Sequence, residues 1–596
     1  MALHSIDWAF VITFFIISLG IGLAVSRRAG KSSAEFFLSG RNMPWWLLGV
    51  SMVATTFSTD TPNLVTDIVR QNGVAGNWAW WAFLLTGMLT VFVYAKLWRR
   101  SRVLTDIEFY ELRYSGKAAA FLRGFRALYL GVFFNILIMA TVSLAAIKIG
   151  GVLLNISPVQ TLLIALFITM IYSALGGLRG VLLTDFFQFI MAMIGSIGAA
   201  IVAINLPQVG GLSNLLTHEN VFSKLSLLPD FSNTEMLITL LIIPLAVQWW
   251  SVWYPGAEPG GGGYIVQRML SAKTEKHAMG ATLFFNAAHY ALRPWPWILV
   301  ALCSLIVFPN LEALQSAFPN VSPSVIRHDL AYPAMLTYLP HGLLGLVVAS
   351  LIAAFMSTIS THLNWGSSYV VNDFYKRFVN ADASEKRQVL VGRLSTVGLM
   401  ILTGILALLL ENALQAFNIL LQIGAGTGLL FILRWFWWRI NPFSELTAMV
   451  VSFLIAVYFQ IVHPHTGLPA ISTHIQLVTG VFITTICWVT VTLFTKPSNK
   501  NTLRSFYRLV KPGGPGWKKV IEQANQENEP IEGSGQAWDV PTGILCMVLG
   551  CFAVYSALFA TGNWIYGKHL SASVLTLVAV IATVLLVKMW VKLRVE

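Results

Sequence analysis

The chain has 596 residues, of which 56% are hydrophobic and only 11% charged, and its mean hydropathy is +0.69. Soluble domains carry about 25% charged residues, so this composition excludes a soluble globular protein. The net charge of +13 is explained by membrane topology, as argued below, and gives no reason to expect nucleic acid as a partner. The four cysteines are scattered through apolar runs, which favours ordinary packing over a disulfide framework or a zinc site.

Apolar stretches long enough to cross about 30 Å of hydrocarbon recur along the whole chain. The first, from Ile6 to Val25, is long and lacks a small-residue cleavage site, so we expect no cleavable signal peptide. The pattern predicts an all-α polytopic membrane protein in contact with the lipid bilayer. We expect about fifteen spans, at residues 6–25, 44–68, 75–97, 121–147, 158–176, 180–205, 234–256, 277–308, 341–370, 388–411, 412–437, 441–462, 471–495, 540–561 and 572–592.

Lys and Arg are distributed unevenly over the predicted loops. With the N-terminus outside, most of them fall on inner segments, in clusters such as Arg27 with Arg28, and Lys376 with Arg377. Since basic loops stay in the cytosol, we expect a plasma (inner) membrane protein with an outer N-terminus and a cytosolic C-terminus. The polar stretch 496–538, rich in Gly, Pro and charge, is expected to be a cytosolic loop too poor in apolar residues to form a domain.

Two predicted spans are interrupted by helix-breaking residues. Asp60 lies in "VATTFSTDTPN" of the second span, where Pro62 and a Ser/Thr cluster make a continuous helix unfavourable. The seventh span ends in "VQWWSVWYPGAEPGGGGYIVQR", whose prolines and glycines must also interrupt the helix. Ions at membrane depth cost ~2.5–3.5 kcal/mol on insertion scales, so Asp60 calls for a functional reason. Interrupted helices five spans apart are typical of secondary transporters with inverted repeats.

The ninth span carries hydroxyl side chains at Ser357, Thr358, Ser360 and Thr361. Ser357, Ser360 and Thr361 share one helix face, while Thr358 lies about 100° further round, so the cluster could serve two adjacent sites. A lone Ser or Thr more often bonds a helix carbonyl or joins two helices. Four together, opposite a broken helix, favour a binding site. For Asp185, early in the sixth span, a ligand role and a position at the inner interface near Arg179 both stay open.

Other polar motifs carry weaker signals. "GAGTGL" at Gly424–Leu429 has the outline of a dinucleotide motif, but no strand precedes it, so close packing or hinge flexibility is favoured. His463 and His465 are expected in a short outer loop and not in a metal site. His289 and Arg293, one helical turn apart, could line a cavity or extend toward the interface. No HExxH or GxSxG motif and no paired carboxylates with a basic partner appear, so we expect no enzyme.

Four segments closely resemble signature segments of the sodium:solute symporter family, to which the sodium/glucose and sodium/proline cotransporters belong. They are "SAEFFLSGRNMPWWLLGVSMVATTFS", "SALGGLRGVLLTDFFQ", "YIVQRMLSAK" and "AAFMSTISTHLNWGSSYVVNDFYK", and the resemblance covers about the first 440 residues. It implies the leucine-transporter fold, with an extra N-terminal helix and loop at 1–43 and two five-helix inverted repeats at 44–205 and 234–437. Peripheral helices at 438–495, the loop 496–538 and C-terminal helices at 539–596 would follow.

The resemblance also implies binding sites for Na+, the coupling ion. The main site would use the backbone carbonyls of Ala54, Phe57 and Ala354 and the hydroxyls of Ser357 and Thr358. Neutral oxygens suit sodium, because they bind this hard cation weakly enough to release it into a low-sodium cytosol. Some relatives have a second sodium site, for which this chain offers Asp185, Ser360 and Thr361.

The solute pocket does not align cleanly with that of the sugar carriers. Its expected residues follow the two helix breaks and are Asp60, Thr61, Gln248, Trp249, Trp250 and Trp253. We therefore expect a sodium-coupled symporter that imports a small organic solute (a sugar, amino acid or carboxylate) by alternating access. The alternative is a solute sensor, which would need a separate partner because only two further spans follow Trp538. The sequence does not indicate an oligomeric state.

Overall fold

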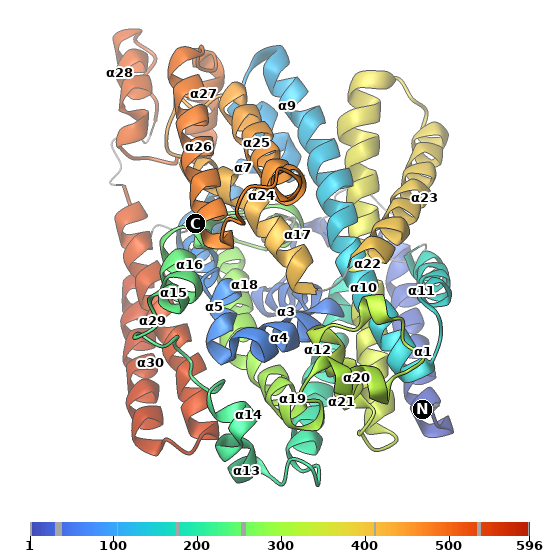
Figure 1. Cartoon of the computed structure of the whole chain (residues 1–596). Helices are drawn as coiled ribbons and strands as arrows, with labels where there is room; N and C mark the ends of the chain where they lie inside the picture. The colour runs from blue at the N-terminus through green and yellow to red at the C-terminus, as the bar shows by residue number, and fades with distance from the viewer. Residues whose placement is uncertain are drawn as a thin grey trace.

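The computed structural model describes residues 3–29, 39–103, 105–173, 178–251, 258–410, 413–532, 538–593 and 595. Within these residues the protein is helical, and the one β-bridge joins Met43 to Ala272. Most of the long helices run roughly along one common axis (Figure 1). The predicted all-α polytopic class is therefore confirmed.

Ten helical segments of the described chain are long and apolar enough to cross a membrane. Four shorter apolar helices, at Ser5–Ser18, Trp45–Thr56, Thr234–Ala246 and Leu420–Leu433, overlap further predicted spans. The protein is thus a multi-pass membrane protein. The count of fifteen spans and the division into two inverted repeats stay predictions.

The second predicted span is broken, as its sequence indicates. Helix α3 (Trp45–Thr56) ends at Phe57, whose φ of −85° and ψ of 88° are not helical, and α4 (Asp60–Asn72) begins three residues later. Pro62 lies in the first turn of α4, where its missing N–H costs no hydrogen bond. Asp60 lies in that turn too, where the helix dipole favours a negative charge.

The seventh predicted span ends early. Short helical pieces from α15 (Thr234–Leu237) to α16 (Ile243–Ala246) lead into η8 (Gln248–Trp250), and the chain then leaves the helix at Ser251. Residues 252–257, which include Trp253, Pro255 and Gly256, lie outside the described residues. A new helix, α17, runs over Gly263–Ser271.

Three long helices surround the break between α3 and α4. Helix α12 (Leu178–Ile204) packs against both α3 and α22 (Leu343–Ser368), and α10 (Asn135–Ile149) packs against α4. Helix α24 (Ala413–Leu433) carries the "GAGTGL" motif. There a Cβ on Gly428 would lie 1.7 Å from the carbonyl oxygen of Trp250, and one on Gly426 would lie 2.8 Å from the hydroxyl of Thr484. The motif therefore serves close helix packing.

The remaining long helices complete the bundle. They are α1 (Ser5–Ala29), α9 (Gly116–Leu128), α11 (Pro158–Ser173), α18 (Glu275–Ala287), α19 (Pro294–Val307), α23 (Glu385–Leu409), α25 (Pro442–Val457) and α26 (Thr473–Phe494). Shorter pieces α5 (Trp78–Trp81), α6 (Leu84–Leu89), η3 (Thr90–Tyr94) and α7 (Ala95–Ser101) form the third predicted span.

The segment 496–538, expected only as a loop, contains two helices, α27 (Lys500–Val510) and α28 (Lys518–Gln526). The side chain of Asn499 accepts a hydrogen bond from the N–H of Thr502 and so caps α27. Phe506 and Trp517 are fully buried, and the indole N–H of Trp517 donates to the carbonyl of Trp435. The few apolar residues of this polar segment are thus gathered on one face, which explains why composition alone missed the packing.

The C-terminal helices α29 (Val540–Ile565) and α30 (His569–Trp590) form a hairpin at one edge of the molecule, drawn in red in Figure 1. Helix α29 packs against α6 and η3 of the third span and against η9 (Ala288–Leu292), which joins α18 to α19. The hydroxyl of Tyr555 donates to the carbonyl of Trp81, and the indole N–H of Trp295 donates to the carbonyl of Leu558.

Candidate functional site

Asp185 joins three helices in the buried core of the protein. Its carboxylate accepts hydrogen bonds from Ser51 Oγ of α3 at 2.6 Å and from Ser357 Oγ of α22 at 3.1 Å. Thr55 Oγ1 of α3 adds a longer contact of 3.5 Å. All four side chains are buried, so Asp185 is a core residue.

The charge of Asp185 has a partner on a fourth helix. Nη2 of Arg268, in α17, lies 3.8 Å from Asp185 Oδ2 and donates to Thr55 Oγ1 at 3.2 Å. Nε of Arg268 donates to Ser51 Oγ at 3.3 Å. A buried carboxylate needs such a counter-charge, because burying an unpaired ion costs several kcal/mol. Sequence reasoning missed Arg268, although it stands in the quoted segment "YIVQRMLSAK".

The hydroxyls of α22 differ in their hydrogen bonding. Ser360 Oγ donates to the carbonyl of Ser357 at 3.2 Å, the helix back-bond that a lone serine often makes. Thr358 is fully buried, and its Oγ1 has no hydrogen-bond partner within the described chain. An orphaned buried hydroxyl costs about 1–3 kcal/mol. Thr358 therefore fits a ligand oxygen for a cation.

The break between α3 and α4 lies beside this part of α22. Thr59 Oγ1, in the break, donates to the carbonyl of Leu351 on α22 at 3.3 Å. Phe57 ends α3, and its N–H donates to the carbonyl of Ala54 at 3.0 Å. Ala354 is buried on α22, close in sequence to Ser357. The predicted main-site residues thus come from two elements that the structure packs together, and every candidate ligand atom is an uncharged oxygen.

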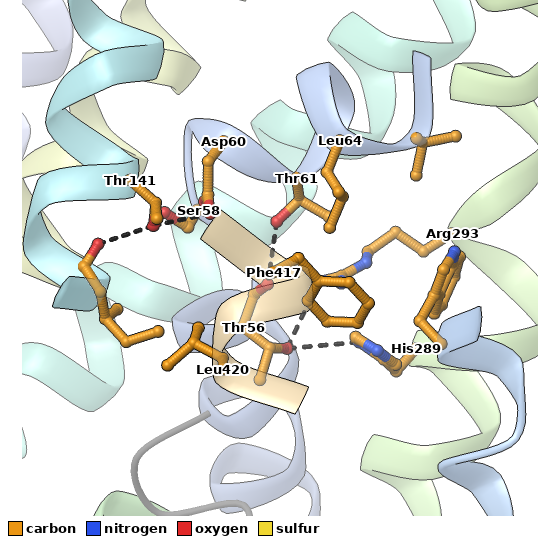
Figure 2. Close-up of a pocket in the computed structure, with 13 residues that line it drawn as sticks. Thr56, Ser58, Asp60, Thr61, Leu64, Thr141, His289, Arg293, Phe417 and Leu420 are labelled. Atoms are coloured by element: carbon orange, nitrogen blue, oxygen red, sulfur yellow. Dashed lines mark hydrogen bonds between the residues drawn. The ribbon is translucent and has the colours of Figure 1, made fainter. Parts of the chain in front are cut away.

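A pocket opens next to the same break (Figure 2). It is walled by α3, α4, α5, α10, η9 and α24. Its lining residues are Thr56, Ser58, Asp60, Thr61, Leu64, Val65, Trp80, Ile138, Thr141, His289, Arg293, Phe417 and Leu420. Asp60 and Thr61, which we expected in the solute cavity, both line it.

Two opposite charges face this pocket from different helices. Asp60 Oδ2 accepts a hydrogen bond of 3.4 Å from Thr141 Oγ1, while its buried Oδ1 has no hydrogen-bond partner in the part of the chain that the structure describes. Arg293 is buried, and its Nη1 donates to the carbonyl of Val53 at 3.1 Å. Within the described residues, Nε and Nη2 of Arg293 have no hydrogen-bond partner. No ion pair joins Asp60 to Arg293 among the residues that the structure describes.

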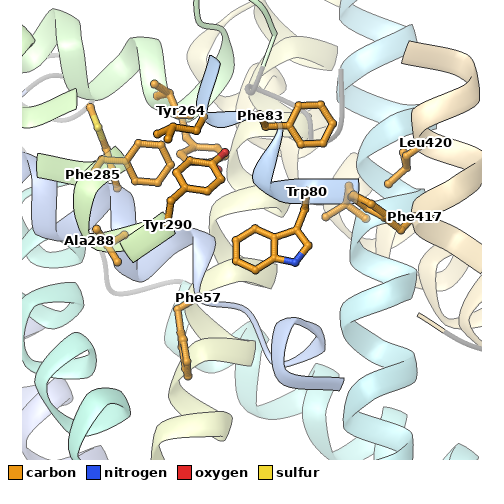
Figure 3. Close-up of a cluster of buried hydrophobic side chains, with 14 of the residues drawn as sticks. Phe57, Trp80, Phe83, Tyr264, Phe285, Ala288, Tyr290, Phe417 and Leu420 are labelled. Atoms are coloured by element: carbon orange, nitrogen blue, oxygen red, sulfur yellow. The ribbon is translucent and has the colours of Figure 1, made fainter. Parts of the chain in front are cut away.

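Aromatic rings form the apolar side of the pocket (Figure 3). The ring of Trp80 stacks on Tyr290 with a centroid distance of 5.8 Å and lies 5.6 Å from the ring of His289. His289 Nδ1 also lies 3.4 Å from Thr56 Oγ1. Phe417 and Leu420 of α24 close the pocket from a helix far away in sequence.

The other residues expected in the solute cavity do not line this pocket. Gln248 Nε2 donates to the carbonyl of Ala79 at 2.5 Å, which ties η8 to α5. Trp249 and Trp250 are half-buried and contact each other at 5.4 Å between ring centroids. Trp253 lies outside the described residues.

Several pocket residues gave little signal in the sequence. Thr141, Phe417 and Leu420 look like ordinary residues of apolar spans, and only the fold brings them to Asp60. His289 and Arg293 were detectable because polar groups are rare at membrane depth. We considered that they could line a cavity or extend toward the interface, and in the structure both line the pocket.

The chain is similar to known proteins over most of its length. A model of the sodium:solute symporter family matches residues 36–496. The sodium/glucose cotransporter of Vibrio parahaemolyticus is 25% identical over 484 residues, which cover 77% of this chain and 86% of that protein. The sodium/myo-inositol cotransporter 2 of Oryctolagus cuniculus is 25% identical over 487 residues, or 75% of this chain and 69% of the other.

A solved structure shows the same fold. It is a substrate-bound, outward-open state of a Na+-coupled sialic acid symporter, and the two chains superimpose with a TM-score of 0.62 at 20% sequence identity. The match covers 83% of this chain and 99% of that chain.

Proposed function

Because the chain belongs to the sodium:solute symporter family, we propose that it imports a small organic solute together with Na+ by alternating access. The chain is a transporter and not an enzyme, as its curated relatives are sodium/solute cotransporters. Basic loops support an outer N-terminus and a cytosolic C-terminus in the plasma membrane. The observation that carries the proposal is the orphaned hydroxyl of Thr358 beside the break between α3 and α4.

The main sodium ion is proposed to lie between this break and α22. Its ligands would be the carbonyls of Ala54, Phe57 and Ala354 and the hydroxyls of Ser357 and Thr358. Such neutral oxygens are ligands that a hard cation accepts. Ser357 already contacts Asp185, so the negative charge of Asp185 would act on the ion through that hydroxyl.

A second sodium ion is proposed at Asp185, Ser360 and Thr361. This site has a competitor in the structure, because the guanidinium of Arg268 lies beside the same carboxylate. The ion would have to share Asp185 with Arg268 or displace the Arg268 guanidinium. We therefore expect the second ion to bind more weakly than the first.

Sodium and solute would be coupled through α3 and α4. An ion between Phe57 and α22 would fix the break, and Asp60 and Thr61 of the solute pocket follow it directly. Each ligand would then raise the affinity for the other by the same factor, as linkage requires.

The test is binding of ²²Na+ to the purified full-length protein without any solute. We expect saturable binding that unlabelled Na+ displaces and K+ does not. A Thr358→Ala variant should bind at least several-fold more weakly, because it lacks one of about five ligand oxygens. The absence of sodium binding in the folded wild-type protein would contradict the proposal.

A further inference from the structure

We propose that the solute is zwitterionic, with a cationic group that binds Asp60, an anionic group that binds Arg293, and an apolar body between them. This inference rests on the proposed function and names the class of solute. It comes from the chemistry of the pocket, in which the charged atoms without partners lie at two separate places and the surfaces between them are largely apolar.

The acidic side of the pocket fits a substituted ammonium group. Asp60 Oδ1 is buried and has no hydrogen-bond partner among the described residues, and Oδ2 accepts a long bond from Thr141. A buried carboxylate with so little compensation is costly at membrane depth. A bound cation would supply the missing charge, and Thr61, Ser58 and Thr141 add hydroxyls around it.

The basic side of the pocket fits a carboxylate. One nitrogen of Arg293, Nη1, donates to the carbonyl of Val53 and places the cation at the C-terminal end of α3. This contact is structural, since a cation at a helix C-terminus is favourable. It leaves Nε and Nη2 without a hydrogen-bond partner among the described residues, and these two donors form the edge of the guanidinium that binds a carboxylate in a bidentate manner.

In Figure 2, Asp60 lies beside Thr141, and the side chain of Arg293 enters the pocket from the side of His289. The apolar residues of the pocket are Leu64, Val65, Trp80, Ile138, Phe417 and Leu420. A polyol carries hydroxyls all round and would leave several of them against these side chains without hydrogen bonds, at a cost of about 1–3 kcal/mol each. A solute with a single charge would give a directly bound partner to only one of Asp60 and Arg293.

The experiment uses the purified full-length protein and measures its melting temperature in Na+ and in K+. The zwitterionic probes are L-valine, L-leucine, L-phenylalanine, L-methionine and glycine betaine. Two analogues of L-leucine, the amine 3-methylbutylamine and the acid 4-methylpentanoate, each lack one charged group. Glucose and myo-inositol represent neutral polyols. We expect at least one zwitterion to raise the melting temperature in Na+, with an affinity at least tenfold above that of the amine and the acid.

Two variants show whether the charges act on the solute. Asp60→Asn should weaken zwitterion binding at least tenfold and change binding of the acid less than threefold. Arg293→Gln should also weaken zwitterion binding at least tenfold, but it should change binding of the amine less than threefold. Asp230→Asn is the matched control, because Asp230 makes only local bonds to Ser232 in an exposed turn and does not line the pocket.

The outcomes separate this inference from the proposed function. Stabilisation by glucose or myo-inositol in Na+, with none by the zwitterions, overturns the zwitterion inference and leaves sodium symport intact. If Asp60→Asn loses binding of the zwitterions, the amine and the acid equally, the zwitterion inference is also overturned, since Asp60 would then be structural. If Na+ itself neither binds nor stabilises the protein, the proposed function fails as well.

Discussion

Thr358 and Ser357 are neighbours on α22 with different surroundings. Ser357 Oγ already donates to Asp185, whereas Thr358 Oγ1 has no partner in the described chain. We expect Thr358→Ala to raise the sodium concentration for half-maximal solute uptake at least tenfold, because a charged contact of about 1.5–3 kcal/mol is lost. Thr358→Ser, which keeps the oxygen, should restore a sodium dependence close to that of the wild type.

The control for this prediction is Ser350→Ala on the same helix. Ser350 is buried too, but its Oγ donates to the carbonyl of Val347, so its loss should leave the sodium dependence unchanged. Sodium-dependent uptake into proteoliposomes measures all three variants. An unchanged sodium dependence in Thr358→Ala would mean that this hydroxyl is only a packing group.

At the scale of elements, the broken helix was predictable and the walls of its pocket were not. Pro62 and the hydroxyls before it indicate the break locally, because proline and competing side chains weaken helices wherever they occur. The pairing of Asp185 with Arg268, and of Asp60 with Thr141, depends on how separate helices pack. A single sequence holds no local trace of such contacts. The same holds for α27 and α28, because their buried aromatic residues lie in a segment whose overall composition is polar.

At Gly428, α24 lies directly against η8 of the seventh predicted span. A Cβ there would lie 1.7 Å from the carbonyl oxygen of Trp250, which is backbone and cannot rotate away. We expect Gly428→Ala to push η8 away from α24 and to destabilise the protein by at least ~1–3 kcal/mol. The melting temperature of the purified variant measures this.

Gly398→Ala and Gly404→Ala, both on α23, are the matched controls. A Cβ at either position meets nothing within 4 Å, and neither glycine needs a left-handed backbone. Alanine also favours helix over glycine by about 0.8–1.0 kcal/mol, so the controls should keep or raise the melting temperature. Equal melting temperatures for Gly428→Ala and the controls would show that α24 can shift at no cost.

For the whole molecule, the number of charges that cross with each solute reports how many sodium ions are transported with it. With two ions and a zwitterionic solute of no net charge, two charges cross per cycle, and each contributes ~2.3 kcal/mol per 100 mV. We expect a reversal potential that fits two charges in the wild type and one in Asp185→Asn, with Asp230→Asn as a control. One charge in both the wild type and Asp185→Asn would mean that Asp185 serves only as the counter-charge of Arg268.

The hairpin of α29 and α30 also bears on the transport cycle. Alternating access requires one group of helices to turn against another. Tyr555 is bonded to Trp81 in the third span, and Leu558, less than one turn further on, is bonded to Trp295 at the start of α19. These two partners belong to different predicted repeats, so α29 fastens a helix of one half to a helix of the other. The helices that carry Trp81 and Trp295 would therefore move together as one rigid body. Helix α30, which packs chiefly on α29, would move with them at the lipid-facing edge of the protein.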